Sequence, residues 1–288
     1  MSEAAGGAGL QPATPTVPDV LRLSTEYLAA KGSETPRLDA ERLLSKATGL
    51  ERIELYMHID RPLTQAELAE ARALVARRGR REPLQYVLGE WGFRRLVLTV
   101  DPRALIPRPE TEILVERCLA LLEGREAPVV LDVGTGSGAI ALAIADEHPG
   151  ALVTAIDSSD DALALAAENM ERTGLAVSLL EHDLFTGLPA GPWDLVVSNP
   201  PYVGRWDVPA LQPEVRDWEP HAALTAEGAV EAVARGAAAA LAAGGAVALE
   251  VGEGQADETA LLLGELGLVD VRITLDLAGI KRVVEGRR

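Results

Sequence analysis

Apolar residues in the first third of the chain recur with helical spacing. One segment places them at i, i+3 and i+7, on a single face of a helix: Leu68, Ala71 and Val75. Thr64 stands just before this segment, with Glu67 three residues further on, which is a capping-box pattern. An earlier group of leucines marks a second such segment: Leu38, Leu43 and Leu44. Residues 18–82 are therefore predicted to form a small all-helical domain.

The periodicity changes immediately after this domain. Gln85–Leu88 and Leu96–Val100 are β-prone runs that flank Gly89 and Gly92. Short runs of this kind, separated by glycines, are typical of paired strands. We therefore predict a β-hairpin linker over residues 83–104.

From Val129 onward, strand-like runs alternate with helical segments. The predicted strands are apolar runs: Val129–Val133, Leu152–Ile156, Val177–Leu180, Leu195–Val197, Ala246–Val251, Val271–Leu275 and Lys281–Val284. The predicted helices lie after Gly138, near Asp161–Glu171, around Val230–Leu241 and from Gln255 to Leu266. Such alternation predicts an α/β fold, in which helices cover a mostly parallel seven-stranded sheet. This domain is expected to span residues 105–288.

The chain carries a net charge of −17, and the acidic excess lies in its C-terminal two-thirds. Residues 96–288 hold 13 basic and 31 acidic side chains, whereas nucleic-acid-binding domains draw affinity from neutralising phosphates. Neither DNA nor RNA is therefore expected to be a direct partner. One group of arginines is the exception to this acidic pattern: Arg77, Arg78, Arg80 and Arg81. This group is either a solvated helix end or a contact for an acidic partner.

The remaining composition favours a soluble, cytoplasmic protein without a metal. No run approaches the ~18 apolar residues that a membrane span requires, so no membrane partner is expected. Residues 1–17 have neither a basic start nor an apolar block and are predicted to be a disordered tail. Cys118 stands alone and is interpreted as a small buried hydrophobic residue. The histidines show no spacing that is typical of metal ligands.

An apolar strand runs directly into a glycine-rich turn at the start of a helix. The turn consists of Gly134, Thr135, Gly136, Ser137 and Gly138. Glycines let the chain turn sharply and let a ligand approach main-chain N–H groups closely. The dinucleotide fingerprint is G-x-G-x-x-G, whereas these alternating glycines, preceded by Asp132, resemble the cofactor loop of class I methyltransferases. A tight structural turn is the alternative interpretation.

Acidic residues follow the next two predicted strands. Asp157 can accept hydrogen bonds from both hydroxyls of a ribose, although it could instead merely cap the following helix. Asp183 could bond an adenine amino group, with Leu184 and Phe185 as an apolar wall, although Phe185 also fits a core position. These residues predict S-adenosylmethionine as the cofactor. Its methionine end would lie at the glycine loop, its ribose at Asp157 and its adenine at Asp183.

The next strand ends at Asn199-Pro200-Pro201-Tyr202, where ligands of open α/β sheets bind. The prolines fix the backbone, so that the Asn199 side-chain oxygen and the Pro200 carbonyl can accept both protons of a planar NH₂ group. This grip aims the nitrogen for methyl transfer without a dedicated base, and Tyr202 can flank the planar group beside a sulfonium. Asn199, Pro200 and Tyr202 are therefore predicted to be catalytic, Pro201 to contact the substrate, and Asn199 also to contact the cofactor. A simple Asn-Pro turn is the alternative.

With these residues, the sequence resembles the release-factor glutamine methyltransferases, the PrmC/HemK family, over nearly the whole chain. The matching segments include Arg37–Glu41, Pro83–Gly89 and Glu219–Leu224. Leu105–Glu112 discriminates best, because Asn-Pro-Pro-Tyr also occurs in DNA adenine methyltransferases. From the residues alone, two prolines that bracket Arg108 favour a structural strut. An aromatic residue often stands in the family where this chain has Leu184.

The resemblance implies methylation of the glutamine amide in the Gly-Gly-Gln motif of peptide chain release factors. It also implies that the helical domain over residues 18–82 helps to grip the release factor. Three alternatives stay open. A nucleic-acid adenine amino methyltransferase would share the Asn-Pro-Pro-Tyr chemistry, and a ribosomal-protein glutamine methyltransferase would share the reaction. A non-catalytic binding module would not need Asp157 and Asn199 together.

Overall fold

The structure is a computed structural model that describes residues 14–288 and divides into two compact units. The first unit ends at Leu88 and the second begins at Gly89. Most of the predicted tail, residues 1–13, lies outside the described residues. None of the helices formed by the described residues is long and apolar enough to span a membrane.

The first unit is helical, as its periodicity predicts. Its helices are α1 (Val17–Ala30), α2 (Pro36–Thr48), α3 (Arg52–Met57), α4 (Gln65–Gly79) and α5 (Leu84–Leu88). The capping box is confirmed at the start of α4, where the Thr64 hydroxyl accepts from the Glu67 N–H at 3.2 Å and the Glu67 carboxylate accepts from the Thr64 N–H at 2.7 Å. Leu68 and Ala71 are buried in one cluster with Leu43 of α2. Since Val17 already belongs to α1, the helical unit begins before residue 18.

Three of the arginines near the end of α4 bind groups within the same unit. Arg78 pairs with Asp39 at 2.7 Å, and both side chains are buried. Arg77 pairs with Glu82, and Arg81 donates at 2.6 Å to a backbone carbonyl in the loop between α1 and α2. The interpretation as a solvated helix end is therefore wrong for Arg78, which ties α4 to α2.

The segment predicted as the first strand of the hairpin is the short helix α5 instead. Leu84 and Val87 lie three residues apart in α5 and are both buried in the core of the first unit. So short a run fits the helical and the strand period equally well, and packing decides between them. The hairpin lies further along, where β1 (Glu90–Phe93) pairs antiparallel with β2 (Leu96–Thr99). The linker predicted over residues 83–104 is thus divided between the two units.

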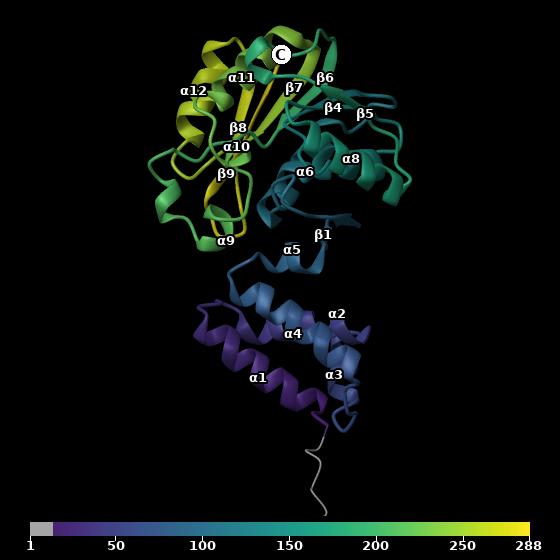
Figure 1. The fold of residues 1–288 in the computed structure, drawn as a ribbon. Helices are drawn as coiled ribbons and strands as arrows, with labels where there is room; N and C mark the ends of the chain where they lie inside the picture. Colours follow the sequence, from purple (N-terminus) through teal and green to yellow (C-terminus); the bar gives the residue numbers. More distant parts are fainter. Residues whose placement is uncertain (1–13) are drawn as a thin grey trace, which may run out of the picture. The chain divides into compact units, whose positions relative to one another are not determined.

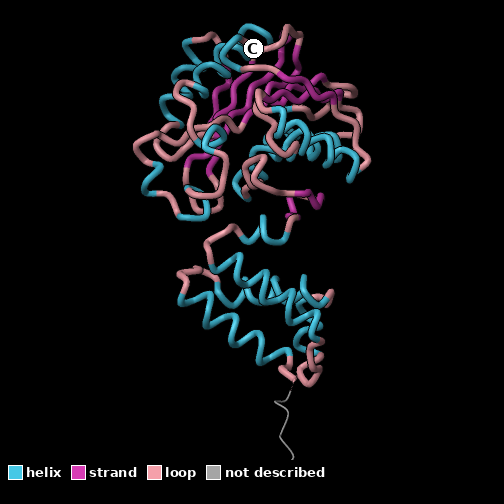
Figure 2. Tube along the Cα trace, viewed as in Figure 1, coloured by secondary structure: helices cyan, strands magenta, loops and turns pink. Residues whose placement is uncertain are grey.

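The second unit is built around a sheet of seven strands within the described residues, in the order β5-β4-β3-β6-β7-β9-β8 (Figure 1). The strands are β3 (Val129–Val133), β4 (Leu152–Asp157), β5 (Ser178–Glu181), β6 (Trp193–Ser198), β7 (Leu241–Glu250), β8 (Val269–Leu275) and β9 (Lys281–Arg287). Neighbours from β5 to β7 are parallel, whereas β9 is antiparallel to β7 and β8. Figure 2 shows the first unit as helices and loops, and this sheet in the second. The predicted α/β fold with a mostly parallel sheet is confirmed.

Helices cover both faces of the sheet. The main ones are α6 (Pro109–Leu121), α7 (Ala139–Glu147), α8 (Asp160–Thr173), α11 (Ala229–Ala240) and α12 (Ala256–Glu265). Successive strand residues point to opposite faces. Val130 and Leu195 pack in one cluster with α6 and α7, and Leu131 and Val196 pack in another with α11 and α12. Cys118 of α6 is buried in the first of these clusters, as its interpretation as a small hydrophobic residue requires.

Candidate active site

The residues predicted to bind the cofactor lie at one edge of the sheet. They follow the carboxyl ends of β3, β4 and β6, which are parallel and therefore end at the same edge. A cavity of about 180 Å³ opens there. The predicted residues in its wall are Gly134, Thr135, Gly136, Ser137, Asp157, Leu184, Asn199 and Pro201. The fold thus brings segments that are far apart in the sequence to one site.

The glycine loop has a backbone conformation that other residues rarely adopt. The angle φ is +72° at Gly134, +56° at Gly136 and +82° at Gly138, where a β-carbon would be strained. Gly138 is the N-cap of α7 and is not among the residues that line the cavity. A β-carbon at Gly138 would lie 3.3 Å from side-chain carbons of Ala166 and Leu142. The first two glycines therefore open the loop towards a ligand, and the third lets α7 pack against α8.

A buried carboxylate, Asp132, lies behind the loop. One of its oxygens accepts from the Thr135 hydroxyl at 2.7 Å, and the other has no hydrogen-bond partner among the described residues. Burial raises the pKa of Asp132 to about 7, although the hydrogen bond from Thr135 lowers it. Asp132 is not among the residues that line the cavity, so it braces the loop from within.

Asp157 holds the loop from the end of β4. Its carboxylate accepts from the N–H of Gly136 at 2.9 Å and from the N–H of Ser159 at 3.0 Å. The N-cap of α8 is Ser159, whose hydroxyl accepts from the Ala162 N–H at 3.2 Å, so the alternative that Asp157 merely caps this helix is wrong. An ionised carboxylate has about four acceptor positions. Asp157 therefore retains acceptor capacity at the cavity wall.

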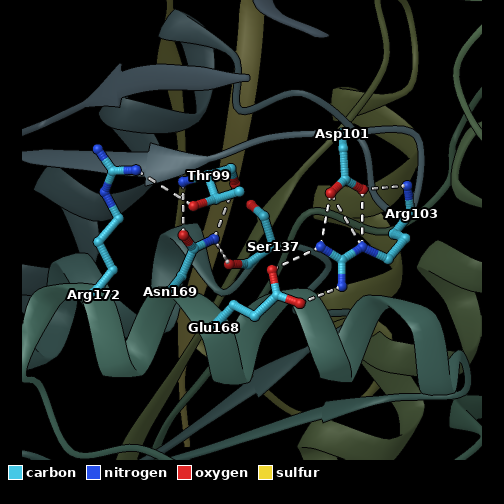
Figure 3. A network of polar contacts seen from close by, with 7 residues as sticks. All are labelled: Thr99, Asp101, Arg103, Ser137, Glu168, Asn169 and Arg172. Atoms are coloured by element: carbon cyan, nitrogen blue, oxygen red, sulfur yellow. Dashed lines mark hydrogen bonds and ion pairs between the residues drawn. The ribbon is translucent and has the colours of Figure 1, made fainter. Parts of the chain in front are cut away.

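The sequence carries no signal for Asn169, which joins the hairpin to the glycine loop. Asn169 is 0% exposed on α8, where it accepts from the Thr99 N–H at 2.7 Å and donates to the Thr99 carbonyl at 3.1 Å (Figure 3). It also donates to the Ser137 carbonyl of the loop at 2.9 Å. The neighbouring Glu168 pairs with Arg103 at 2.7 Å (Figure 3). One helix therefore fixes both the hairpin and the chain that leads into the cavity.

The residues predicted for the adenine end are separated by the structure. Leu184 lines the cavity, whereas Asp183 is not among its lining residues. The Asp183 carboxylate accepts from the Phe185 N–H at 2.9 Å and caps the 3-10 turn η1 (Leu184–Thr186). Phe185 is 53% exposed, so its interpretation as a core residue is wrong. His182, which the sequence did not single out, lines the cavity, and the adenine contact of Asp183 stays a prediction.

The Asn-Pro-Pro-Tyr segment leaves the sheet beside the glycine loop. At the end of β6, the Ser198 hydroxyl donates to the Val133 carbonyl at 2.7 Å and holds the two strand ends together. Asn199 and Pro201 line the cavity, whereas the buried Pro200 is not among its lining residues. The contact predicted between the Pro200 carbonyl and a substrate therefore stays a prediction.

Behind Asn199, hydrogen bonds link the Asn-Pro-Pro-Tyr segment, here called the clamp, to buried side chains. The Asn199 amide nitrogen donates to the Thr111 hydroxyl oxygen at 3.1 Å, and the Thr111 hydroxyl donates to Glu250 at 2.7 Å. Tyr202 is not among the lining residues of the cavity, and its hydroxyl donates to the other oxygen of Glu250 at 3.3 Å. Burial raises the pKa of Glu250, and burial beside this carboxylate raises the pKa of Tyr202 to about 12.

The segment Leu105–Glu112 forms part of the cavity wall, so a structural strut describes it incompletely. Arg108 lines the cavity and pairs with Glu219 at 2.5 Å. Glu219 is buried, and burial raises its pKa while the Arg108 guanidinium lowers it. Ala222 and Ala223 follow Glu219 and also line the cavity. Two of the segments that carry the family resemblance, Leu105–Glu112 and Glu219–Leu224, thus meet at the site.

Two family models match the chain. "PrmC N-terminal domain" matches residues 19–89, and "Methyltransferase small domain" matches residues 110–214. The release factor glutamine methyltransferase of Geobacter sulfurreducens is 45% identical over 276 residues, which cover 94% of this chain and 96% of that relative. The chain belongs to the release factor glutamine methyltransferase family. Another member, from Bordetella pertussis, is 44% identical over 271 residues, with 92% of this chain and 99% of that relative covered.

The fold has matches among solved methyltransferases. The T. thermophilus 16S rRNA N2 G1207 methyltransferase, solved with AdoMet and guanosine, matches with a TM-score of 0.51 and 21% identity. The match covers 69% of this chain and 49% of that chain, and it concerns the fold alone. Membership of the release factor glutamine methyltransferase family makes this chain a methyltransferase, so the predicted enzyme class is confirmed.

Proposed function

We propose that this protein transfers a methyl group from S-adenosylmethionine to the glutamine side-chain amide in the Gly-Gly-Gln motif of peptide chain release factors. The observation that carries the proposal is the position of Asn199 in the same cavity wall as the glycine loop and Asp157. A side chain that can grip an NH₂ group therefore faces a site suited to a nucleoside. Relatives that carry the name release factor glutamine methyltransferase match nearly the whole chain. Such a role belongs in the cytoplasm, with the translation machinery.

The cavity residues fit S-adenosylmethionine. Gly134 and Gly136 expose backbone at the wall, and Asp157 retains acceptor positions for ribose hydroxyls. Leu184 offers the adenine an apolar contact, and the free oxygen of Asp183 is the candidate acceptor for its amino group. When bound, this cofactor supplies an activated methyl group on a sulfonium centre.

The Asn-Pro-Pro-Tyr segment would position the substrate amide. An amide nitrogen is a poor nucleophile because its lone pair is delocalised. The Asn199 oxygen and the Pro200 carbonyl would accept its two protons and so aim this lone pair at the methyl carbon. Orientation of this kind can contribute ~7–11 kcal/mol to lowering a barrier. The methylated nitrogen, then positively charged, loses one proton to solvent, so the chain needs no dedicated base.

The charge and the helical unit support a protein substrate. Residues 96–288 hold 13 basic and 31 acidic side chains, which disfavours a nucleic-acid amine as the acceptor. The family model of the N-terminal domain covers residues 19–89, and we assign the grip on the release factor to this unit. A ribosomal protein would present a similar glutamine, so the choice between the two needs a direct test.

The test is methyl transfer from labelled S-adenosylmethionine by the full-length protein. Separate reactions contain a release factor, the same factor with alanine in place of the Gly-Gly-Gln glutamine, ribosomes, or duplex DNA. We expect label on the intact release factor alone, mapped by mass spectrometry to the Gly-Gly-Gln peptide. Label on DNA, on ribosomes or on the altered factor would contradict the proposal. Asn199→Ala serves as the control that lacks the clamp.

A further inference from the structure

A buried chain of hydrogen bonds lies behind the clamp and joins three parts of the fold. Thr111 lies in the first turns of α6, and Glu250 is the last residue of β7. Thr111 is 3% exposed and Glu250 is 1% exposed. The bonds run from Asn199 to Thr111 at 3.1 Å and from Thr111 to Glu250 at 2.7 Å. Thr111 lines the cavity together with Asn199, whereas Glu250 is not among the lining residues.

The direction of these hydrogen bonds follows from the number of available protons. A threonine hydroxyl has one proton, and an ionised carboxylate can only accept. The Thr111 proton is therefore committed to Glu250, and the Thr111 oxygen can only accept from Asn199. An asparagine amide has NH₂ on one side and a carbonyl oxygen on the other. With its NH₂ directed at Thr111, Asn199 has its oxygen left for a substrate in the cavity.

We propose that Thr111 and Glu250 are positioning residues that fix the orientation of the Asn199 amide, so that its oxygen and not its NH₂ meets the substrate. The inference deepens the proposed function and rests on it. A flipped Asn199 would bring NH₂ against the NH₂ of the substrate, which opposes two donors. The fixed orientation also disfavours a carboxylate in place of the substrate amide, because an oxygen would then meet an oxygen.

The surroundings of Glu250 maintain this direction. Its second oxygen accepts from the Tyr202 hydroxyl at 3.3 Å, so both oxygens act as acceptors. Burial raises the pKa of Glu250, whereas the hydrogen bonds from Thr111 and Tyr202 and the positive charge of Arg282 favour its ionised form. Tyr202 therefore helps to hold Glu250, while Glu250 holds Thr111.

The first test removes the hydroxyl of Thr111 without changing the size of the side chain. Thr111→Val should lower kcat for the Gly-Gly-Gln substrate by about 10- to 100-fold, since misplacement of a positioning group can cost about 100-fold. The dissociation constant for S-adenosylmethionine and the melting temperature should change little. Thr111→Ser, which retains the hydroxyl, should restore most of kcat. The matched control is Thr259→Val, because Thr259 is 4% exposed and its hydroxyl donates to the carbonyl of Gln255, the N-cap residue of its helix.

The second test reverses the direction of the hydrogen bonds. In Glu250→Gln, the amide oxygen can accept from Tyr202 while its NH₂ donates to Thr111. The Thr111 proton is then free to meet the Asn199 oxygen, which favours the flipped amide. We expect Glu250→Gln to lower kcat by about as much as Thr111→Val, and the double variant to lose little more than either single variant.

The outcomes separate this inference from the proposed function. If the unaltered protein does not methylate the Gly-Gly-Gln glutamine, the proposed function fails. If it does, and Thr111→Val or Glu250→Gln retains full kcat, the function stands and the positioning role is wrong. Fully additive losses in the double variant would likewise refute a shared action through Asn199. Loss without rescue in Thr111→Ser would point to packing rather than to the hydroxyl.

Discussion

The two halves of the active site are held in place by different means. The cofactor half depends on the backbone. Its glycines have positive φ, and the Gly136 N–H donates to the carboxylate of Asp157, which lies 21 residues further along the chain. The amide half depends on side chains, since Asn199 contacts Thr111 across 88 residues and Thr111 contacts Glu250 across 139. Cofactor affinity and turnover should therefore respond to different substitutions.

Asn199→Ala should have the largest effect and should fall on turnover. The variant removes an acceptor that acts on the reacting amide, and loss of one such positioned group costs about 100- to 1000-fold in kcat. The dissociation constant for S-adenosylmethionine should stay within about threefold, since the loop and Asp157 are untouched. Single-turnover kinetics and a cofactor titration measure the two quantities. Equal losses in kcat and in cofactor affinity would contradict the separation of the site into a cofactor half and an amide half.

Asp157→Ala should show the opposite pattern. Removal of a carboxylate that accepts ribose hydroxyls and holds the Gly136 N–H should weaken S-adenosylmethionine binding by roughly 10- to 100-fold, because hydrogen bonds to charged groups contribute about 1.5–3 kcal/mol. At saturating cofactor, kcat should be nearly retained. Asp160→Ala is the matched control, since Asp160 is exposed in the first turn of α8 and is not among the residues that line the cavity. If Asp160→Ala lost as much affinity for S-adenosylmethionine as Asp157→Ala, the assignment of Asp157 to the ribose hydroxyls would be wrong.

The same division explains how much the sequence could predict. The glycine loop, Asp157 and the Asn-Pro-Pro-Tyr segment each follow a predicted strand, and parallel strands end at one edge, so their meeting there could be foreseen. The sheet was predictable for the same reason, because long alternating elements carry a strong periodic signal. The short helix α5 was not, because five residues carry too little periodicity to decide between helix and strand.

The side chains behind the site could not be predicted, because nothing local marks them. Asn169 sits mid-helix with partners 32 and 70 residues away, and Glu250 is one acidic residue at the end of an apolar strand. Their roles depend on which elements the fold places side by side. Thr111 belongs to the segment Leu105–Glu112, which carries the family resemblance. Its hydroxyl finds its partners Asn199 and Glu250 only because the fold places α6 beside the ends of β6 and β7.

Asn169→Ala tests whether the cofactor half of the site, which depends on the backbone, also needs a buried side chain. The variant leaves the Thr99 N–H and the Thr99 and Ser137 carbonyls without their partner. Water can enter the vacated space, so we expect a loss of roughly 1–2 kcal/mol in the free energy of unfolding, with a modest weakening of cofactor binding. Arg172→Ala is the control, since Arg172 contacts the same strand from a 40%-exposed position (Figure 3) and should change stability by less than about 0.5 kcal/mol. Equal losses of stability in the two variants would show that the buried hydrogen bonds of Asn169 contribute no more than the exposed contacts of Arg172.

Asp132 should give an effect that appears only as a function of pH. Its pKa is raised to about 7 in the folded protein, against ~3.9 in an unfolded chain, so between these values the folded state binds a proton that the unfolded state does not. Stability is therefore fully present below pH ~4 and is lost as pH rises through about 7, with a fall of about 1.4 kcal/mol between pH 6 and pH 8. Urea unfolding of the cofactor-free protein measures this slope, and Asp132→Asn should remove it while retaining an acceptor for Thr135. The difference between the slopes of the unaltered protein and the variant is decisive, and identical slopes would mean that the buried carboxylate stays ionised behind the loop.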